Sequence, residues 1–240
     1  MFSFTPRLAA QSLLSAVNVQ LSLCYEQRIP QEIPVIVISN HRSFLDAAIL
    51  IKTLPYPLRI ACHHYMGETP FLREIINSLG CFPLAESKQR QRQFFNQANN
   101  LLAARQWVGL FPEGTQPMVE PTKPQQIGEF QRGFAHLAWR TQVPNLAVLP
   151  VALASLDETI YPTIPIRWLK NFDREEPFFN RSGLHPMLVY HRVKVLIGSP
   201  YLITADQKLE YKGRQAKKLA IDLTEYCQKQ IQQLLQQGCY

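Results

Sequence analysis

The residues best suited to chemistry lie in the segment Asn40 to Asp46, whose sequence is N-H-R-S-F-L-D. A histidine can take a proton from a hydroxyl, and a carboxylate that holds one ring nitrogen leaves the other free for that task. Ser43 and Asp46 have the S-x-x-D spacing of a capping box, which predicts a helix start at Ser43. His41 would then lie just before the helix, with Asp46 folded back beneath it. The spacing predicts a His41–Asp46 pair that acts as a general base.

The same pair has a structural interpretation, in which a buried histidine is held by the acid of a helix cap. That interpretation is favoured for an isolated pair, because helix caps are common. A second segment changes the balance: Phe111 to Thr115 has the sequence F-P-E-G-T and also follows an apolar run. Gly114 lets a ligand approach the backbone, and Glu113 could accept a hydroxyl or neutralise a cation. Two such segments favour a functional site.

Both segments follow short apolar runs, Val35 to Ile38 and Trp107 to Phe111, which predict buried strands. Ligands of parallel sheets sit at the carboxyl ends of the strands, so the two segments would meet at one edge. Strands alternating with helices predict a single α/β domain with a mostly parallel central sheet flanked by helices. The other predicted strands cover 58–62, 81–84, 146–154 and 188–197, and the helices cover 44–53, 71–79, 88–105, 128–141 and 212–237.

Two segments fall outside this alternation. Leu8 to Tyr25 carries no formal charge but has polar residues at helical spacing, which predicts an amphipathic helix rather than a membrane span or signal peptide. Its apolar face would pack on the domain's own core or contact a membrane. Residues 160–187 hold four prolines and an acidic cluster, which predict an irregular insertion. The predicted division is an N-terminal amphipathic helical segment over 1–30 and a domain over 31–240.

The motif N-H-x-S-x-x-D, followed about seventy residues later by F-P-E-G-T, resembles the glycerolipid acyltransferase family, which includes bacterial 1-acylglycerol-3-phosphate acyltransferases. Three further matches support the resemblance, which runs from about Ile33 to Tyr201. Phe130 to Gly133 is similar to the F-K-x-G turn of that family. Val148 to Val151 is similar to its V-x-P-V strand, and Ile197 to Pro200 to its late G-x-P strand end.

The resemblance implies a mechanism in which His41 is the general base and Asp46 orients it. The acceptor hydroxyl would attack the thioester of acyl-carrier protein or acyl-coenzyme A directly, with no acyl-enzyme and no metal or other cofactor. No G-x-S-x-G elbow is present in the sequence. A backbone N–H near Ser43 is expected to stabilise the oxyanion. The expected substrate-binding residues are Asn40, Ser43, Phe111, Pro112, Glu113, Gly114, Thr115, Arg132 and Pro150.

The positions that bind the acceptor's phosphate in this family depart from its pattern. The family has a G-x-x-x-x-x-R segment, but here Gly80 to Glu86 ends in a carboxylate, which repels a phosphate. Lys88, Arg90 or Arg92, just downstream, could supply the positive charge instead. Gln131 stands in place of the lysine of F-K-x-G. The acceptor is therefore 1-acylglycerol-3-phosphate or, alternatively, a non-phosphate lipid or sugar alcohol.

A third alternative is an inactive family member that binds a membrane or a partner; the presence of His41, Asp46 and Glu113 weighs against it. Composition excludes other classes. The chain has 240 residues, 46% of them hydrophobic, and a net charge of +7. Disorder is excluded by the apolar content, and a disulfide scaffold by five cysteines without paired spacing.

The run Cys62 to His64 has poor geometry for a metal, so no metal site is predicted. The basic residues lack the aromatic interleaving of nucleic-acid modules. The positive charge suits a membrane surface. We expect a peripheral protein on the cytoplasmic face of a membrane, with a lipid substrate and an acyl-carrier protein or coenzyme A thioester as partners.

Overall fold

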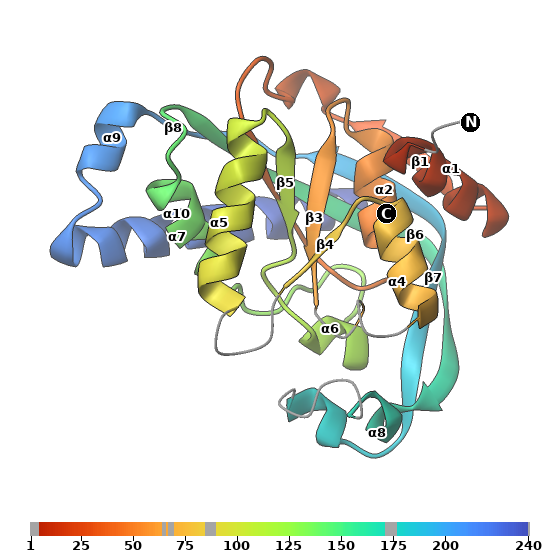
Figure 1. Ribbon diagram of the computed structural model, residues 1–240. Helices are drawn as coiled ribbons and strands as arrows, with labels where there is room; N and C mark the ends of the chain where they lie inside the picture. The colour runs from red at the N-terminus through yellow and green to blue at the C-terminus, as the bar shows by residue number, and fades with distance from the viewer. Residues whose placement is uncertain (1–4, 64–65, 67–69, 85–89, 171–176, 240) are drawn as a thin grey trace.

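The computed structural model describes residues 5–63, 66, 70–84, 90–170 and 177–239. They form an eight-stranded sheet with helices on both faces (Figure 1). The strands are β1 (Gln20–Cys24), β2 (Val35–Ser39), β3 (Leu58–Cys62), β4 (Phe82–Pro83), β5 (Trp107–Leu110), β6 (Leu146–Pro165), β7 (Leu184–Ile197) and β8 (Tyr201–Ile203). The helices are α1 (Pro6–Ala16), α2 (Asp46–Thr53), α4 (Pro70–Ser78), α5 (Arg90–Ala103), α6 (Gln116–Val119), α7 (Gly133–Arg140), α8 (Ile166–Leu169), α9 (Ala205–Leu209) and α10 (Gly213–Gly238), with 3-10 turns over Glu26–Arg28 and Pro177–Asn180.

The strand order across the sheet is β1-β7-β6-β2-β5-β3-β4, with β8 beside β6. Strands β6, β2, β5, β3 and β4 run parallel to one another, whereas β7 and β8 are antiparallel to β6. β1 is parallel to its neighbour β7. The predicted α/β fold with a mostly parallel sheet flanked by helices is therefore confirmed.

The centre of the sheet is buried on both faces, as β2 shows. Val35 and Val37 pack in the cluster that includes α1, α2 and α4, whereas Ile36 and Ile38 pack in the cluster that includes α5, α7 and α10. All four side chains are fully buried. A β-branched run that alternates between two apolar layers is typical of a central parallel strand. Its carboxyl end is consequently held rigidly from both sides.

The N-terminal segment corrects the prediction of one helix from Leu8 to Tyr25. Helix α1 ends at Ala16, because Asn18 adopts a left-handed φ of 56° and the N–H of Val19 bonds to the carbonyl of Leu14 in a Schellman motif. The chain then forms β1, which joins the sheet beside β7.

The apolar face of α1 was expected either to pack on the domain's own core or to contact a membrane. Ala9, Ala10 and Leu14 are buried, and α1 packs against α2, so this face lies on the domain's own core. No helix in the described ranges is both long and apolar enough to cross a bilayer.

Residues 160–187 are not the irregular insertion that the prolines predict. β6 and β7 continue as a two-stranded ribbon past the sheet, with Pro162 opposite Pro186, and α8 follows at its end (Figure 1). Each strand of a ribbon has one free edge, and a proline whose nitrogen faces that edge costs no ladder bond. The acidic cluster at Asp173 to Glu176 lies outside the described residues.

Candidate active site

The two polar segments predicted from the sequence lie side by side at one edge of the sheet. β2 and β5 are parallel neighbours with Ile38 opposite Leu110, so the residues that follow the two strands emerge together. The backbone N–H of His41 donates a hydrogen bond of 2.9 Å to Oε1 of Glu113, which joins the segments directly. The expected meeting of both segments at this edge is confirmed.

His41 and Asp46 form the expected pair, with His41 Nδ1 2.8 Å from Asp46 Oδ2. Asp46 is fully buried at the start of α2, and Oδ2 also accepts the backbone N–H groups of Arg42, at 2.7 Å, and Ser43, at 2.9 Å. Three donors on one oxygen fix the direction of the carboxylate. With this acceptor at Nδ1, the neutral ring carries its proton there and presents a lone pair at Nε2.

The start of α2 differs from the predicted capping box. The helix begins at Asp46, and the N-cap residue is Leu45, whose side chain makes no capping bond. The hydroxyl of Ser43 instead donates to the carbonyl of Leu188 at 2.6 Å and accepts the N–H of Leu45 at 3.2 Å. Only the bond from the Ser43 N–H to the Asp46 carboxylate belongs to a capping box. That bond occupies the N–H of Ser43 itself, so the oxyanion donor expected near Ser43 stays a prediction.

The His41 ring is held in place but remains accessible. It stacks on Phe111 with a centroid distance of 4.2 Å and an interplanar angle of 13°. Its side chain is 21% exposed, and Nε2 makes no hydrogen bond to any residue that the structure describes. The stacking and the Asp46 bond fix the ring plane, so Nε2 is available to a substrate hydroxyl.

Glu113 is a clamp between two loops. Its Oε1 accepts the N–H of His41 and its Oε2 accepts the N–H of Gly128, at 2.5 Å. Burial raises the pKa of Glu113 above its usual range, while the two backbone donors act in the opposite direction. A side chain at position 128 would place its Cβ 3.1 Å from Oε2, so glycine keeps this contact open. Both Glu113 oxygens thus serve to hold the backbone beside the His41–Asp46 pair.

Asn40 and Pro150 lie deeper in the sheet than the His41 ring. The Asn40 side chain is buried and bonds the backbone of Leu153 twice, through Nδ2 at 3.1 Å and Oδ1 at 2.8 Å. This ladder-like pair anchors the exit of β2 to β6. Pro150 lies opposite Ile38 within the sheet, and its carbonyl accepts the N–H of Gly198. The structure thus places both residues in supporting positions.

The remaining residues of the F-P-E-G-T segment form a turn against the 130–132 loop. The carbonyl of Pro112 accepts the N–H of Gln131 at 2.9 Å, and the Gln131 amide would lie 3.0 Å from a Cβ at Gly114. Gly114 has a φ of +70°, which favours glycine. Thr115 precedes α6, and Arg132 is exposed just before α7. The structure therefore brings the predicted F-K-x-G-like turn next to F-P-E-G-T.

The predicted phosphate-binding cations are placed only in part. Lys88, like Glu86, lies outside the described residues. Arg90 begins α5, and Arg92 is exposed on the first turn of that helix. That one of these cations binds the acceptor's phosphate stays a prediction.

One supporting feature that the sequence did not indicate is a buried ion pair beside the site. The guanidinium of Arg42 bonds both carboxylate oxygens of Glu158, at 2.7 and 2.8 Å, and the carbonyl of Thr122. Burial alone lowers the pKa of Arg42, but the bond and charge of Glu158 hold it above its ordinary value. Arg42 fills an unspecified position of the motif and its partner is 116 residues away, so no local pattern links them.

Tyr190 on β7 is the second residue that sequence reasoning missed. It is fully buried, and its hydroxyl and Asp46 Oδ1 each lack a hydrogen-bond partner among the described residues. Burial, followed by the negative charge of Asp46, raises the pKa of Tyr190 well above its usual value. The strand alternation predicted a partly exposed β7, and no motif marks Tyr190 as a neighbour of Asp46.

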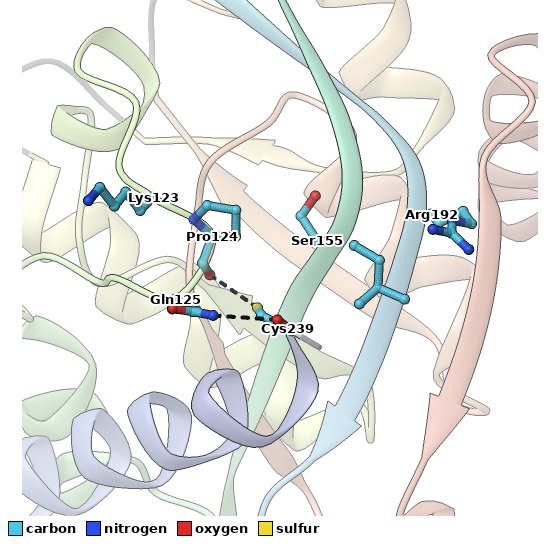
Figure 2. A pocket seen from close by; sticks show the side chains of 7 residues that line it. Lys123, Pro124, Gln125, Ser155, Arg192 and Cys239 are labelled. Atoms are coloured by element: carbon cyan, nitrogen blue, oxygen red, sulfur yellow. Dashed lines mark hydrogen bonds between the residues drawn. The ribbon is translucent and has the colours of Figure 1, made fainter.

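No group of three His, Cys, Asp or Glu side chains that could hold a metal occurs in the described part of the chain. Cys62 ends β3, where burial raises the pKa of its thiol, and His64 lies outside the described residues. A cavity of about 410 Å³ lies elsewhere, between the 123–125 loop, Ser155 on β6, Arg192 on β7 and Cys239 after α10 (Figure 2). None of the residues predicted for the site lines it.

Comparison with known proteins finds relatives among solved structures and among protein sequences. The chain superposes on the crystal structure of the 1-acyl-sn-glycerophosphate (LPA) acyltransferase PlsC from Thermotoga maritima with a TM-score of 0.59 and 16% identity, over 97% of this chain and 77% of that one. At that identity the likeness shows the fold. It agrees with the layered sheet and helices described above.

Each of the two sequence relatives matches about half of this chain. The 1-acyl-sn-glycerol-3-phosphate acyltransferase of Saccharomyces cerevisiae is 26% identical over 54% of this chain and 41% of its own length. A Mycoplasma pneumoniae protein named "Probable 1-acyl-sn-glycerol-3-phosphate acyltransferase" is 30% identical over 48% of this chain and 44% of its own. The chain thus matches less than half the length of either relative.

The sequence model of the family described as Acyltransferase matches residues 22–154. This region is more than half of the chain and contains His41, Asp46 and the F-P-E-G-T turn. The chain therefore belongs to the acyltransferase family.

Proposed function

We propose that this protein is an O-acyltransferase that moves a fatty acyl group from an acyl thioester to the free hydroxyl of 1-acylglycerol-3-phosphate. The observation that carries the proposal is the His41–Asp46 pair, with a 2.8 Å bond at Nδ1 and Nε2 without a partner among the described residues. The printed names of the two sequence relatives support this acceptor. The reaction would serve phospholipid synthesis.

The proposed reaction begins when Nε2 of His41 takes the proton of the acceptor hydroxyl. The hydroxyl oxygen attacks the thioester carbonyl carbon, forming the new C–O bond and a tetrahedral oxyanion. Collapse breaks the C–S bond, and the imidazolium returns its proton to the thiolate, so an ester and a free thiol leave. Asp46 stabilises the transient imidazolium through its bond to Nδ1, and Glu113 holds the His41 backbone. No metal and no cofactor besides the thioester is required.

The donor in this proposal is acyl-carrier protein or coenzyme A carrying the acyl chain. A cation among Lys88, Arg90 and Arg92 would bind the acceptor's phosphate. Glu86, where the family has arginine, favours a second candidate function, in which the acceptor is a lipid or sugar alcohol without phosphate. A peripheral position on the cytoplasmic face of a membrane would bring the enzyme to a lipid acceptor.

Competition among acceptors tests the function. The purified protein would receive a labelled acyl thioester with equal amounts of lysophosphatidic acid, monoacylglycerol and a glycolipid, and the labelled products would be resolved. We expect label mainly in phosphatidic acid, and at least about a hundredfold less of it with His41→Ala. A matched control is His191→Ala, because His191 lies on β7 and its ring bonds the Thr159 hydroxyl. A preference for monoacylglycerol would support the second candidate, and transfer by His41→Ala at a rate close to the parent's would contradict the mechanism.

A further inference from the structure

The end of the β6–β7 ribbon gathers apolar side chains on the outside of the protein. We call residues 160–170 and 177–186 the hairpin tip. Eight large apolar side chains of the described chain are exposed, and five of them belong to the hairpin tip. Those five are Ile160 (47% exposed), Tyr161 (46%), Ile164 (41%), Trp168 (60%) and Leu184 (50%).

The hairpin tip is ordered around a small apolar cluster of its own. Ile166 and Leu169 of α8 and Phe179 are buried against Val119 of α6. The N–H of Ile166 bonds the carbonyl of Gly183, which closes the two sides of the tip. Because α8 buries Ile166 and Leu169, Trp168 is left exposed on its outer side. The exposure of the apolar residues is therefore fixed by packing rather than by a loose end.

The charges on the α8 side of the hairpin tip complement an anionic surface. Arg167 and Lys170 are exposed and flank Trp168, and no carboxylate occurs between Ile160 and Lys170, whereas the sequence that follows, 171–176, carries three carboxylates and one arginine. Tryptophan and tyrosine favour the boundary between lipid headgroups and acyl chains, where an apolar ring and a polar atom are both accommodated. Each nearby cation adds attraction to anionic lipid. This composition is typical of a segment that enters the interface of a bilayer.

The hairpin tip lies beyond the edge of the sheet that carries His41. β6 runs parallel to β2 with Val151 opposite Ser39, so the later part of β6 continues past the end of β2 (Figure 1). Glu158 on this extension holds Arg42, and the hairpin tip begins two residues later. At about 3.3 Å per residue, its end at Pro165 lies roughly 25 Å from that ion pair.

A bilayer is better suited than a second copy of this chain to cover the exposed apolar side chains of the hairpin tip. A complete large side chain buries about 150–200 Å², so five half-exposed ones offer roughly 400 Å². A stable dimer interface buries about 800 Å² on each partner. A lipid surface sets no such minimum, because each inserted side chain contributes separately.

We propose that the hairpin tip inserts into the surface of a phospholipid bilayer, with Trp168, Tyr161 and Ile164 among the acyl chains and Arg167 and Lys170 at anionic headgroups. The proposal rests on the proposed function in that a lipid acceptor would then enter the site from the same membrane. It moves the expected membrane contact away from α1, whose apolar face is used in the core.

Vesicle binding tests the proposal without reference to catalysis. The full chain would be sedimented with vesicles of phosphatidylcholine containing phosphatidylglycerol, and we expect Trp168→Ser with Ile164→Ser to weaken partitioning by at least about tenfold. The matched control is Leu202→Ser with Leu209→Ser, two exposed leucines on β8 and α9, far from α8 in Figure 1. Arg167→Gln with Lys170→Gln should weaken binding to the anionic vesicles and leave binding to pure phosphatidylcholine unchanged.

Tryptophan emission locates the contact. The chain has three tryptophans, and Trp107 and Trp139 are buried, so Trp168 alone is exposed. We expect vesicles to shift the emission to shorter wavelength in the parent but not in Trp168→Phe. An unshifted parent spectrum, or equal losses in the tip and control variants, would overturn the proposal. So would concentration-dependent self-association that Trp168→Ser abolishes without any vesicle binding.

Activity on two forms of acceptor separates this proposal from the proposed function. With a short-chain acceptor dissolved as a monomer, the tip variant should match the parent, whereas with the acceptor in vesicles its rate should fall in proportion to binding. His41→Ala should bind vesicles like the parent while losing transfer in both assays. If the tip variant bound normally, the docking proposal would fail and the proposed function would stand.

Discussion

We call the turn over residues 40–46 the His41 turn. It and the hairpin tip both lie beyond the carboxyl end of β2, but they differ in which side chains are buried and which are exposed. In the His41 turn, Asn40, Ser43 and Asp46 are buried polar side chains, and each is held by backbone groups. In the hairpin tip, apolar side chains such as Trp168 are exposed, and charged ones such as Arg167 lie in solvent beside them. The His41 turn thus holds a few polar atoms in fixed positions, whereas the hairpin tip exposes apolar surface to its surroundings.

The difference teaches what each region can tolerate. The proposed proton transfer needs Nε2 of His41 within hydrogen-bonding distance of a hydroxyl, so a displacement of the His41 turn should lower the rate strongly. Insertion into a lipid surface depends on summed apolar area and charge, so single changes in the hairpin tip should act gradually. Variants that affect one region and leave the other unchanged would establish the comparison.

The largest effect is expected for His41→Ala. Removal of the proposed general base should lower acyl transfer by about 10²–10⁴-fold, because a positioned base contributes rate enhancement of that order. The free energy of unfolding should change little, since the ring is partly exposed and Asp46 retains its two backbone donors. Rates at saturating substrate and urea unfolding measure the two quantities. Equal losses in His191→Ala would show a general effect of histidine removal.

The next effect concerns Glu158, which connects the ribbon to the His41 turn. Glu158→Gln leaves the buried Arg42 guanidinium without its counter-charge, so we expect a loss of about 3 kcal/mol in the free energy of unfolding. Transfer should fall as well, because Arg42 adjoins His41 in the chain. Urea unfolding is the measurement, and Asp157→Asn, an exposed neighbour, is the control. An unchanged unfolding energy would show that the two regions are independent.

The sequence predicted the His41 turn far better than the ribbon. The His41–Asp46 pair and its meeting with F-P-E-G-T follow from apolar strands and local spacing. The partner of Arg42 and the neighbour of Asp46 come from β6 and β7, more than a hundred residues away, and strand pairing at that distance leaves no local pattern. The ribbon was missed because prolines usually interrupt sheets, and a two-stranded ribbon is the exception.

The end of α1 also could not be predicted from local spacing. Leu8 to Tyr25 has helical spacing, but Asn18 takes a left-handed conformation and the next residues pair with β7. A tertiary contact overrides local propensity here. Capping at Ser43 failed for a related reason: the Ser43 hydroxyl donates to the Leu188 carbonyl on β7, and in that position its oxygen accepts the N–H of Leu45 rather than that of Asp46.

Glu113→Gln tests the clamp and carries a pH dependence. The pKa of Glu113 is raised by burial, so the folded state holds a proton at pH values where the unfolded carboxylate, with a pKa near 4.5, has lost it. Stability of the parent should therefore fall as the pH rises from about 4.5 through the raised pKa. The variant should lack this slope. At neutral pH its amide would face an N–H donor, with a loss of about 1–3 kcal/mol. Thermal unfolding at several pH values measures both, and Glu129→Gln, which changes an exposed carboxylate next to Gly128, is the control.

The smallest effect is expected for Tyr190→Phe. The buried Tyr190 hydroxyl has no hydrogen-bond partner among the residues that the structure describes, so its removal should eliminate no strong bond and leave the ring packing intact. We expect the free energy of unfolding to change by less than about 1 kcal/mol and transfer to change only a few-fold. A loss above about 2 kcal/mol, together with a displaced pH–rate profile, would show that the hydroxyl binds Asp46 Oδ1 in solution. Tyr190 would then be a positioning residue, and the His41 turn would depend on the root of the same ribbon that carries the hairpin tip.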